Sequence, residues 1–256
     1  MGYLSERKQV QRTGNVTLRP STPWTATIHA LLRHLETVGF SGAPRIVGTG
    51  VDPTGRETVE FIAGEVVPQR VWSDEGIFDL GQLLNRLHQA TASFRPPLDA
   101  VWQDSFLRAT GPNAIVSHGD AAPWNVVARH GRPVALIDWE LAGPVDRLRE
   151  LAHTGWLNAQ LFDDDVAERQ GLPPVEDRVR QLRLFADGYQ LPATDRAELV
   201  TRLIDVAILS SASDAIEAKI TPDSTGADWL VWGVVWRARS AAWLVRHRSL
   251  LEQALR

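Results

Sequence analysis

The sequence has no cysteine among its 256 residues. Disulfide bridges, thiolate zinc sites and cysteine nucleophiles are therefore excluded, and the absence of cysteine favours a reducing, cytoplasmic location. No apolar run reaches the ~18 residues that a membrane-spanning helix needs, so we expect no association with a membrane. Lysine and arginine form no cluster along the chain, and the net charge is −4. Because nucleic-acid binding depends on clustered positive charge, we expect no nucleic-acid partner.

The composition is that of a globular protein with one large domain or two lobes, since 44% of the residues are hydrophobic and 23% are charged. Ten tryptophans stand against two tyrosines. Some of them recur at helical spacing: Trp229, Trp232, Trp236 and Trp243. This spacing predicts one helix face packed against the core, and a place in the wall of a ligand pocket is the alternative.

Strand and turn patterns dominate the first 64 residues. Alternating apolar residues on both sides of Thr13-Gly14 predict a hairpin, and apolar residues at helical spacing before Gly39 predict a helix. Turn residues at 52–55 then separate two further apolar runs. The expected elements, in order, are strands at 8–12 and 15–19, a helix at 25–38, and strands at 45–51 and 57–64.

Helical patterns dominate the rest of the chain. We expect helices at 74–91 and 99–109, short strands at 114–117, 124–129 and 133–138, and helices from 145 to the end. A small strand-rich segment thus precedes a large helical one, which predicts an α+β protein of two lobes with its site in the cleft. We place the boundary so that residues 1–66 form the small lobe and residues 67–256 form the large one.

The stretch SHGDAAPWNVVARHGRPVALIDWE, residues 117–140, has polar residues at the ends of two short apolar runs. Its predicted hairpin brings Asn125 and Asp138 together, with Asp120 on the loop just before it. Carboxylate and amide oxygens suit Mg²⁺, so one carboxylate and one amide can hold the metal. The other carboxylate is then left to receive a proton or to orient a hydroxyl group. Phosphoryl transfer needs little beyond such positioning and charge neutralisation.

Within this stretch, HGDAAPWN followed by ALIDWE resembles the aminoglycoside phosphotransferase family of kinase-like small-molecule phosphotransferases. The resemblance implies a bilobal protein-kinase-like fold, ATP as donor with GTP as the alternative, Mg²⁺, and a hydroxyl group of a small molecule as acceptor. It implies that Asp120 is the catalytic base or orients the acceptor hydroxyl. Asn125 and Asp138 would be the metal ligands, and His118 would brace the catalytic loop.

The resemblance extends beyond the motif to most of residues 8–256. GNVTLRP, APRIVGTG and ETVEFIAGE resemble the family's small lobe, whose last strand ends in a hinge that holds adenine by backbone hydrogen bonds. Glu60, Phe61 and Ile62 would form that hinge. The segment RLRELAH resembles the one in which an acidic residue braces the catalytic loop, so Glu150 would take that role.

Several features depart from the family's pattern. Arg19 stands where the family has a lysine that reaches the ATP phosphates, and arginine keeps the charge but not the shape. The family's helix usually offers a glutamate to pair with that lysine, and the nearest candidate on the predicted helix at 25–38 is His29, which is no obvious partner for Arg19. We expect four strands in the small lobe where the family's fold has five, and no glycine-rich loop precedes Asn15.

These departures keep a second hypothesis open, namely a catalytically weak or inactive pseudokinase that binds nucleotide or a small ligand as a regulatory module. A third is a metal-dependent hydrolase that uses the same two aspartates on a phosphate ester without ATP. Turn chemistry is the simplest explanation of the polar residues, but their joint spacing is hard to obtain from turns alone. The acidic run Asp163–Asp165 either attracts a polycationic acceptor or is a solvated face.

Overall fold

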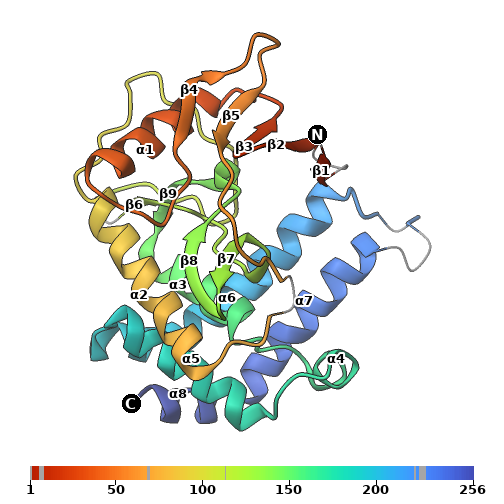
Figure 1. The fold of residues 1–256 in the computed structure, drawn as a ribbon. Helices are drawn as coiled ribbons and strands as arrows, with labels where there is room; N and C mark the ends of the chain where they lie inside the picture. Colours follow the sequence, from red (N-terminus) through yellow and green to blue (C-terminus); the bar gives the residue numbers. More distant parts are fainter. Residues whose placement is uncertain (1, 6–8, 68–69, 113, 222, 225–228) are drawn as a thin grey trace.

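The computed structural model describes residues 2–5, 9–67, 70–112, 114–221, 223–224 and 229–256. An antiparallel sheet stands at one end of the molecule with helix α1 beside it (Figure 1). The elements of this part are β1 (Gly2–Ser5), β2 (Val10–Thr13), β3 (Val16–Arg19), α1 (Thr25–Thr37), β4 (Ile46–Val51) and β5 (Glu57–Glu60). The strands lie in the order β1-β2-β3-β5-β4, so β3 and β5 are neighbours although α1 and β4 separate them along the chain.

Local turns shape this sheet as predicted. β2 and β3 form the expected hairpin at Gly14, whose φ of 60° suits glycine. Between β4 and β5, the Asp52 carboxylate accepts hydrogen bonds from the amides of Thr54 and Arg56, which closes the predicted turn. β5 ends at Glu60, earlier than predicted, because the chain then leaves β3 and runs toward the helical part of the molecule.

The expected count of four strands was wrong, because β1 adds a fifth strand to the sheet in the part of the chain that the structure describes. β1 pairs antiparallel with β2, with Gly2 opposite Arg12 and Tyr3 opposite Gln11. The expected absence of a glycine-rich loop before Asn15 concerns the connection from β1 to β2. That connection includes residues 6–8, which lie outside the described residues.

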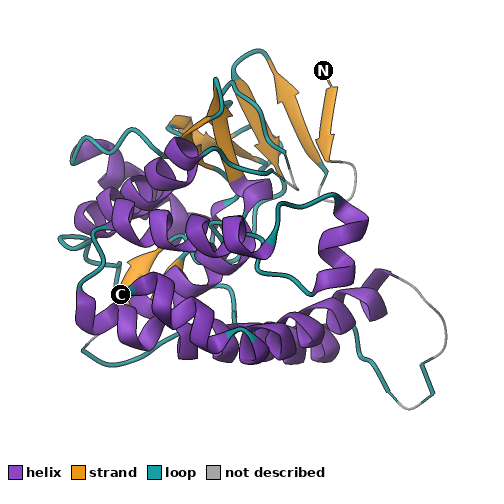
Figure 2. Cartoon of the chain, turned by 90° about the horizontal axis from the view of Figure 1, so that it is seen from below, coloured by secondary structure: helices purple, strands orange, loops and turns teal. Residues whose placement is uncertain are grey.

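Helices make up most of the remaining chain (Figures 1 and 2). Its elements are α2 (Asp74–Thr91), β6 (Ala114–Ser117), the short 3₁₀ helix η1 (Pro123–Asn125), β7 (Val126–Arg129), β8 (Arg132–Leu136), the 3₁₀ helix η2 (Trp139–Leu141), β9 (Gly143–Asp146), α3 (Arg147–Asn158), α4 (Asp164–Gln170), α5 (Val175–Tyr189), α6 (Ala193–Glu217), α7 (Trp229–Arg246) and α8 (Arg248–Leu255). A small strand-rich part followed by a large helical part is the predicted α+β architecture.

Short strands on both sides of the 118–125 loop fix its position. β7 and β8 form the predicted hairpin, and His130 and Gly131 at its turn have positive φ angles of 51° and 73°, as a tight hairpin turn requires. β6 pairs with β9, a strand that the sequence pattern did not predict, and Ser117 lies opposite Gly143. The loop that carries the polar motif therefore starts from one small sheet and ends in another.

The predicted helix at 99–109 does not form, and this segment is an irregular loop. Tertiary hydrogen bonds hold it instead. The Val101 amide donates to Thr27 Oγ1 on α1 at 2.9 Å, and the Arg108 guanidinium donates to the Leu141 carbonyl at 3.0 Å. These long-range contacts tie the segment to α1 and to the chain before β9, so they override the local helical pattern.

The hydrophobic core lies mainly in the helical part, where α2 packs on α5, α3 on α6, and α6 on α7. Trp243 is fully buried and Trp236 packs against the core, as the spacing of the tryptophans predicts, whereas Trp232 is exposed. The side chain of Trp229 lies outside what the structure describes. Among the described residues, no helix combines the length and the apolar character that crossing a membrane requires.

Candidate active site

A loop directly after β6 carries His118, Gly119 and Asp120. His118 Nε2 donates to the Ile137 carbonyl at 2.9 Å, and its Nδ1 accepts a hydrogen bond from the Asp120 amide at 3.2 Å. These partners require the neutral ring with its proton on Nε2. Burial lowers the pKa of His118, which favours the same neutral form. His118 therefore ties the loop to the end of the β7–β8 hairpin, the bracing position that the resemblance implies.

Glu150 on α3 holds the same loop through its backbone. Its Oε1 accepts the Gly119 amide at 2.7 Å, and its Oε2 lies 2.8 Å from Nε2 of His88 on α2. Burial alone would raise the pKa of Glu150, but the hydrogen bonds from His88, Ser117 and the Gly119 amide hold it below its ordinary value. Glu150 thus remains a carboxylate, and its side chain reaches the loop although it is one methylene longer than aspartate.

The β7–β8 hairpin brings Asn125 and Asp138 together, as predicted. The Asn125 carbonyl accepts the Ile137 amide at 2.9 Å, so Asn125 is paired with the residue just before Asp138. Asn125 Nδ2 donates to the Asp120 carboxylate at 2.7 Å. Asp138 has a φ of 64° and a ψ of 62°, a left-handed conformation that costs free energy for a residue other than glycine. The backbone therefore turns sharply at the second aspartate.

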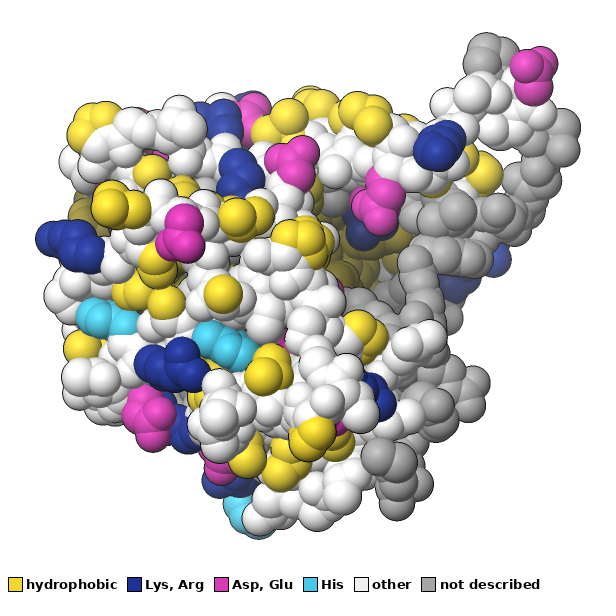
Figure 3. All heavy atoms as spheres, turned by 90° about the horizontal axis from the view of Figure 1, so that it is seen from above, with side chains coloured by type: hydrophobic (Ala, Val, Ile, Leu, Met, Phe, Trp, Pro, Cys, Tyr) yellow, Lys and Arg dark blue, Asp and Glu magenta, His cyan; other side chains and the backbone are white. Residues whose placement is uncertain are grey.

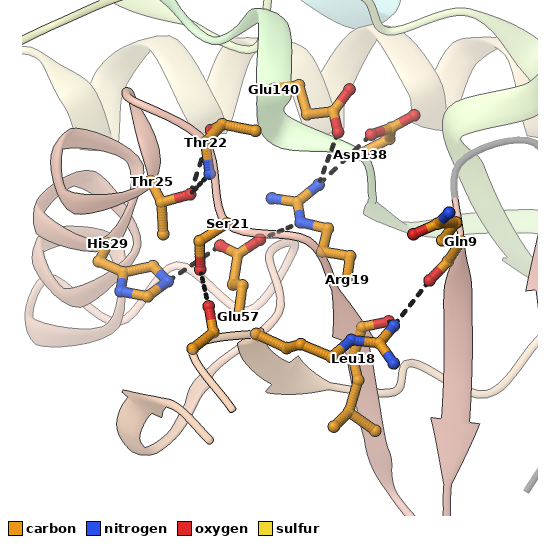
Figure 4. Close-up of polar contacts among 12 residues, drawn as sticks. Gln9, Leu18, Arg19, Ser21, Thr22, Thr25, His29, Glu57, Asp138 and Glu140 are labelled. Carbon is orange, nitrogen blue, oxygen red and sulfur yellow. Dashed lines mark hydrogen bonds and ion pairs between the residues drawn. The ribbon is translucent and has the colours of Figure 1, made fainter. Parts of the chain in front are cut away.

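Arg19 meets Asp138 across the gap between the small sheet and the hairpin (Figure 4). Arg19 Nη1 lies 3.4 Å from Asp138 Oδ1 and 3.9 Å from Glu140 Oε1. The expectation that Arg19 lacks a glutamate partner was wrong, because its Nε donates to the carboxylate of Glu57. The other carboxylate oxygen of Glu57 lies 2.9 Å from His29 Nε2. His29 thus reaches Arg19 indirectly, through a carboxylate.

Glu57 is the residue that sequence reasoning missed. It lies on β5 directly opposite Arg19 on β3, in antiparallel register. Burial alone would raise its pKa, but the hydrogen bond from His29 and the charge of Arg19 hold the pKa of Glu57 below its ordinary value. The sequence signal was present in the strand ETVE, and it required the pairing of β3 with β5 to be recognised.

A cavity of about 430 Å³ lies between the small sheet and the β7–β8 hairpin. Most of its wall is apolar, and its size suits a small ligand. The residues predicted to bind nucleotide or metal all line it: Arg19, Glu60, Phe61, Ile62, Asn125 and Asp138. Seen from the side of the sheet, the surface of the molecule is hollowed between hydrophobic side chains, with charged side chains near the rim (Figure 3).

The hinge segment offers fewer backbone groups than expected. The Glu60 amide donates to the Arg45 carbonyl and the Phe61 amide to the Asn15 carbonyl, each at 2.7 Å. Within the described residues, the Ile62 amide has no such backbone partner. A base bound beside this segment would therefore use the Ile62 amide or backbone carbonyls, and not the amides of Glu60 and Phe61.

A second cavity, of about 330 Å³, adjoins the first. Both cavities have Trp124 and Asp138 in their walls, while Asp120 lines the second one. Asp214 and Arg237 form an ion pair of 2.8 Å in this wall, and further carboxylates and aromatic rings complete it. The sequence analysis did not single out Arg237, because it lies in a helix with no motif. Two ligands, one in each cavity, would come close to each other beside Asp138.

The donor set fits a divalent cation at the junction of the cavities. Asn125 and Asp138 line the same cavity and offer an amide oxygen and a carboxylate, which are hard ligands of the kind that Mg²⁺ prefers. The Asn125 amide nitrogen is turned toward Asp120, which leaves its amide oxygen for another ligand. No group of three or more histidine, aspartate or glutamate residues suited to a metal occurs among the described residues. A cation here would therefore take part of its coordination from substrate and water.

The acidic run at 163–165 belongs to the packing of the helical part. Asp163 forms ion pairs with Arg239 at 2.9 Å and with Arg246 at 3.0 Å. Asp164 accepts a hydrogen bond from the Trp243 indole at 2.7 Å. None of the three aspartates lines either of the two cavities described above. The solvated-face interpretation was therefore incomplete, and a direct role in holding an acceptor has no support from the geometry.

Comparison with known proteins gives a consistent family. The model described as "Phosphotransferase enzyme family" matches residues 95–182, which include the polar motif. The trifolitoxin immunity protein of Rhizobium leguminosarum bv. trifolii is 50% identical over 250 residues, which cover 97% of this chain and 95% of that protein. Such identity over almost the full length means that the two chains share a family as well as a fold.

Solved structures with low identity share the fold. A choline/ethanolamine kinase family protein from Mesorhizobium loti aligns with a TM-score of 0.60 and 17% identity, covering 96% of this chain and 88% of its own. A spectinomycin phosphotransferase, solved with ADP and spectinomycin, aligns with a TM-score of 0.55 and 10% identity, covering 97% of this chain and 92% of its own. The overall architecture of this chain is therefore the kinase-like fold predicted from the motif.

Proposed function

This chain belongs to the phosphotransferase enzyme family, and from that premise we propose that it transfers the γ-phosphoryl group of ATP, or of GTP, to a hydroxyl group of a small molecule. The observation that carries the proposal is the pair of cavities that meet at Asp138. The first suits the nucleotide, because Arg19 and the hinge line it. The second suits the acceptor, because Asp120 lines it.

Each residue of the junction has a role that its position supports. Asp120 would accept the proton of the acceptor hydroxyl or orient that hydroxyl for attack. Asn125 and Asp138 would hold Mg²⁺, which when bound neutralises charge on the transferred phosphoryl group. Arg19 would contact the phosphates of the donor with its Nη groups, because its Nε is already held by Glu57. His118 would brace the loop without touching substrate.

The two parts of the chain would have different roles in binding and catalysis. Residues 1–66 would supply the nucleotide lobe, and residues 67–256 would supply the catalytic loop and the acceptor cavity. The mixed wall of the second cavity, with aromatic rings, carboxylates and Arg237, favours an acceptor that carries both apolar and polar groups. The absence of cysteine supports a cytoplasmic site of action, where ATP is abundant.

The name of the 50% identical relative suggests the biological role. That relative is a trifolitoxin immunity protein. We propose that this chain also confers immunity to a toxin, and that it does so by phosphorylating the toxin on a hydroxyl group. The intact arrangement of Asp120, Asn125 and Asp138, together with a carboxylate for Arg19, favours an active enzyme over the pseudokinase alternative.

The experiment is an assay of ADP release with MgATP and trifolitoxin as acceptor, on wild type and on Asp120→Asn. Asparagine keeps an oxygen for Asn125 but cannot take a proton, so we expect turnover to fall by about 10²-fold or more while MgATP binding is retained. Asp99→Asn is the matched control, because Asp99 is exposed and lines neither cavity. Equal turnover in Asp120→Asn and wild type would refute the assigned role.

A growth assay separates phosphorylation from simple binding of the toxin. The same variants are expressed in a trifolitoxin-sensitive strain, and survival is measured against toxin concentration. Protection by wild type and not by Asp120→Asn supports phosphorylation. Protection by both would favour the regulatory or sequestering module, and release of phosphate from an ester without any ATP would favour the hydrolase.

A further inference from the structure

The two ends of the Arg19 guanidinium group have different partners. It is the last residue of β3, and its Nε donates to Glu57, the first residue of β5. Its Nη1 points the opposite way, toward Asp138 and Glu140 at the cavity (Figure 4). The anchor therefore lies within the small sheet, and Nη1 lies beside Asp138 in the wall of the cavity proposed to hold the phosphates.

The carboxylate that anchors Arg19 is itself fixed. Its second oxygen lies 2.9 Å from Nε2 of His29 on α1, so each oxygen of Glu57 has a partner of its own. Both His29 and Glu57 are buried. A buried carboxylate with a partner on each oxygen cannot rotate without losing one of them, and such a loss is costly in a dry interior. His29 therefore fixes the Glu57 carboxylate, and that carboxylate in turn fixes the position of Arg19.

His29 has little room to move. Gly50 on β4 packs against the ring so closely that a Cβ there would lie 2.7 Å from its Nδ1 and Cε1. Gly50 also has a φ of 97°, which strains any other residue. Farther along the same wall, Ser21 Oγ donates to the Gly55 carbonyl at 2.6 Å and ties the segment after Arg19 to the β4–β5 turn. Helix α1 therefore carries the histidine, and strand β4 closes the space beside its ring.

We propose that the buried pair His29–Glu57 positions Arg19 for the phosphates of the donor nucleotide. The inference rests on the proposed function, because it assumes that a nucleotide occupies the first cavity. The pair would replace the single helix glutamate of the related kinases, with the strand supplying the carboxylate and α1 supplying a histidine behind it. His29 and Glu57 are positioning residues in this scheme, since neither touches the nucleotide.

The physical advantage is pre-organisation of a long side chain. Asp138 and Glu140 attract the same guanidinium, so an unanchored Arg19 would turn fully onto them. It would then neutralise the carboxylate proposed to hold Mg²⁺ and would have to be displaced before nucleotide could bind. The anchor at Nε limits this turn and keeps Nη1 at 3.4 Å from Asp138, in the wall of the cavity proposed to hold the phosphates.

The test is calorimetric binding of MgATP and of adenosine, which has no phosphate, to wild type, His29→Leu, His29→Gln and His34→Leu. His34 is the matched control, because it lies on the same helix and its Nε2 also makes a contact of 2.9 Å, with the Ala90 carbonyl. We expect His29→Leu to weaken MgATP binding about tenfold and to leave adenosine binding unchanged. His29→Gln keeps a donor for Glu57 and should recover most of the affinity.

The outcomes separate this inference from the proposed function. Equal MgATP affinity in His29→Leu and His34→Leu, with wild type binding MgATP normally, overturns the positioning role and leaves the proposed function intact. Parallel loss of MgATP and adenosine binding also overturns it, because general loosening of the sheet would weaken both ligands. A folded wild type that binds neither ligand refutes the proposed function and this inference with it.

Discussion

The histidine–glutamate pair in the helical part and the one in the small sheet support the site in different ways. Glu150 and His88 lie 2.8 Å apart, Glu57 and His29 lie 2.9 Å apart, and all four side chains are buried. The other carboxylate oxygen of Glu150 accepts a hydrogen bond from the backbone amide of Gly119. The other carboxylate oxygen of Glu57 accepts a hydrogen bond from a side chain, that of Arg19.

The two pairs therefore differ in whether the group that the glutamate holds has another partner within reach. The Gly119 amide belongs to the catalytic loop, and Glu150 is its hydrogen-bond partner in the described structure. Arg19, in contrast, has Asp138 and Glu140 within reach if Glu57 is lost. The Glu150–His88 pair therefore determines the conformation of the loop at Gly119. The Glu57–His29 pair selects one orientation for the Arg19 guanidinium among several that are available.

Removal of Glu150 should have the largest effect. Glu150→Ala leaves the Gly119 amide buried without its partner and takes the carboxylate away from the buried His88, so we expect the free energy of unfolding to fall by about 4 kcal/mol, with loss of turnover. Urea unfolding followed by far-ultraviolet circular dichroism measures the change. Glu57→Ala is the comparison, and we expect about half that loss because Arg19 can turn to other carboxylates. An equal loss in both variants would contradict the distinction between the pairs.

A glycine beside each pair gives the next comparison. A Cβ on Gly119, whose φ is 75°, would overlap the Leu141 carbonyl, which is backbone and cannot turn away. We therefore expect Gly119→Ala to cost about 3 kcal/mol of unfolding free energy. The atoms nearest to a Cβ on Gly50 belong to side chains, the His29 ring first among them, and not to backbone, so Gly50→Ala should cost less, about 1–2 kcal/mol.

The two alanine variants should also differ in function. Gly50→Ala pushes on His29 and should weaken MgATP binding in the folded protein, because His29 positions Arg19 through Glu57. Gly119→Ala should impair turnover more than nucleotide binding, because Gly119 adjoins Asp120. Calorimetric titration and the ADP-release assay measure these effects. A Gly50→Ala protein with unchanged MgATP affinity would count against the link between α1 and the phosphate site.

His153 on α3 sharpens the comparison, because it is a buried histidine with no hydrogen-bond partner at Nδ1 among the described residues. Burial, reinforced by the charge of Arg237, lowers its pKa to about 4. Below the unfolded value of 6.5, the unfolded chain therefore binds a proton that the folded chain does not. The contribution of His153 to the free energy of unfolding is therefore present above the unfolded pKa, and it is lost as the pH falls from there toward about 4.

The corresponding prediction concerns the slope of stability with pH. Between about pH 7 and pH 5, His153 should account for a loss of about 2 kcal/mol in the free energy of unfolding. His153→Phe should remove that part of the slope, whatever its effect on stability at pH 7. Urea unfolding at a series of pH values gives the slope for both proteins. Parallel curves for wild type and variant would show that His153 titrates normally in the folded protein.

Much of this protein followed from short-range patterns. The hairpin of β2 and β3, the helices α1 and α2, and the hairpin of β7 and β8 match their predicted places closely. Each depends on apolar periodicity and on turn residues a few positions apart, such as His130 and Gly131. The residues of the polar motif also came together as expected, because a hairpin of that length leaves Asn125 and Asp138 at the same end.

The failures share one physical cause. The segment at 99–109 lost its predicted helix to hydrogen bonds with Thr27 and Leu141, which lie far away in the sequence. Strands β1 and β9 went unpredicted because four residues carry little periodicity, and pairing with β2 and β6 stabilises them. In each case a contact with a distant segment outweighed the local preference.

The sequence by itself determined which groups are proposed to do the chemistry and in what order they follow one another. Asn125 and Asp138 are set by the spacing of one hairpin, and Asp120 precedes them on the adjoining loop. Only the tertiary structure decided how Arg19 is held. Its carboxylate partner lies 38 residues away on β5, and the histidine behind that carboxylate lies on α1. Strand register and helix packing bring these residues together, and both arise only when the small sheet forms as a whole.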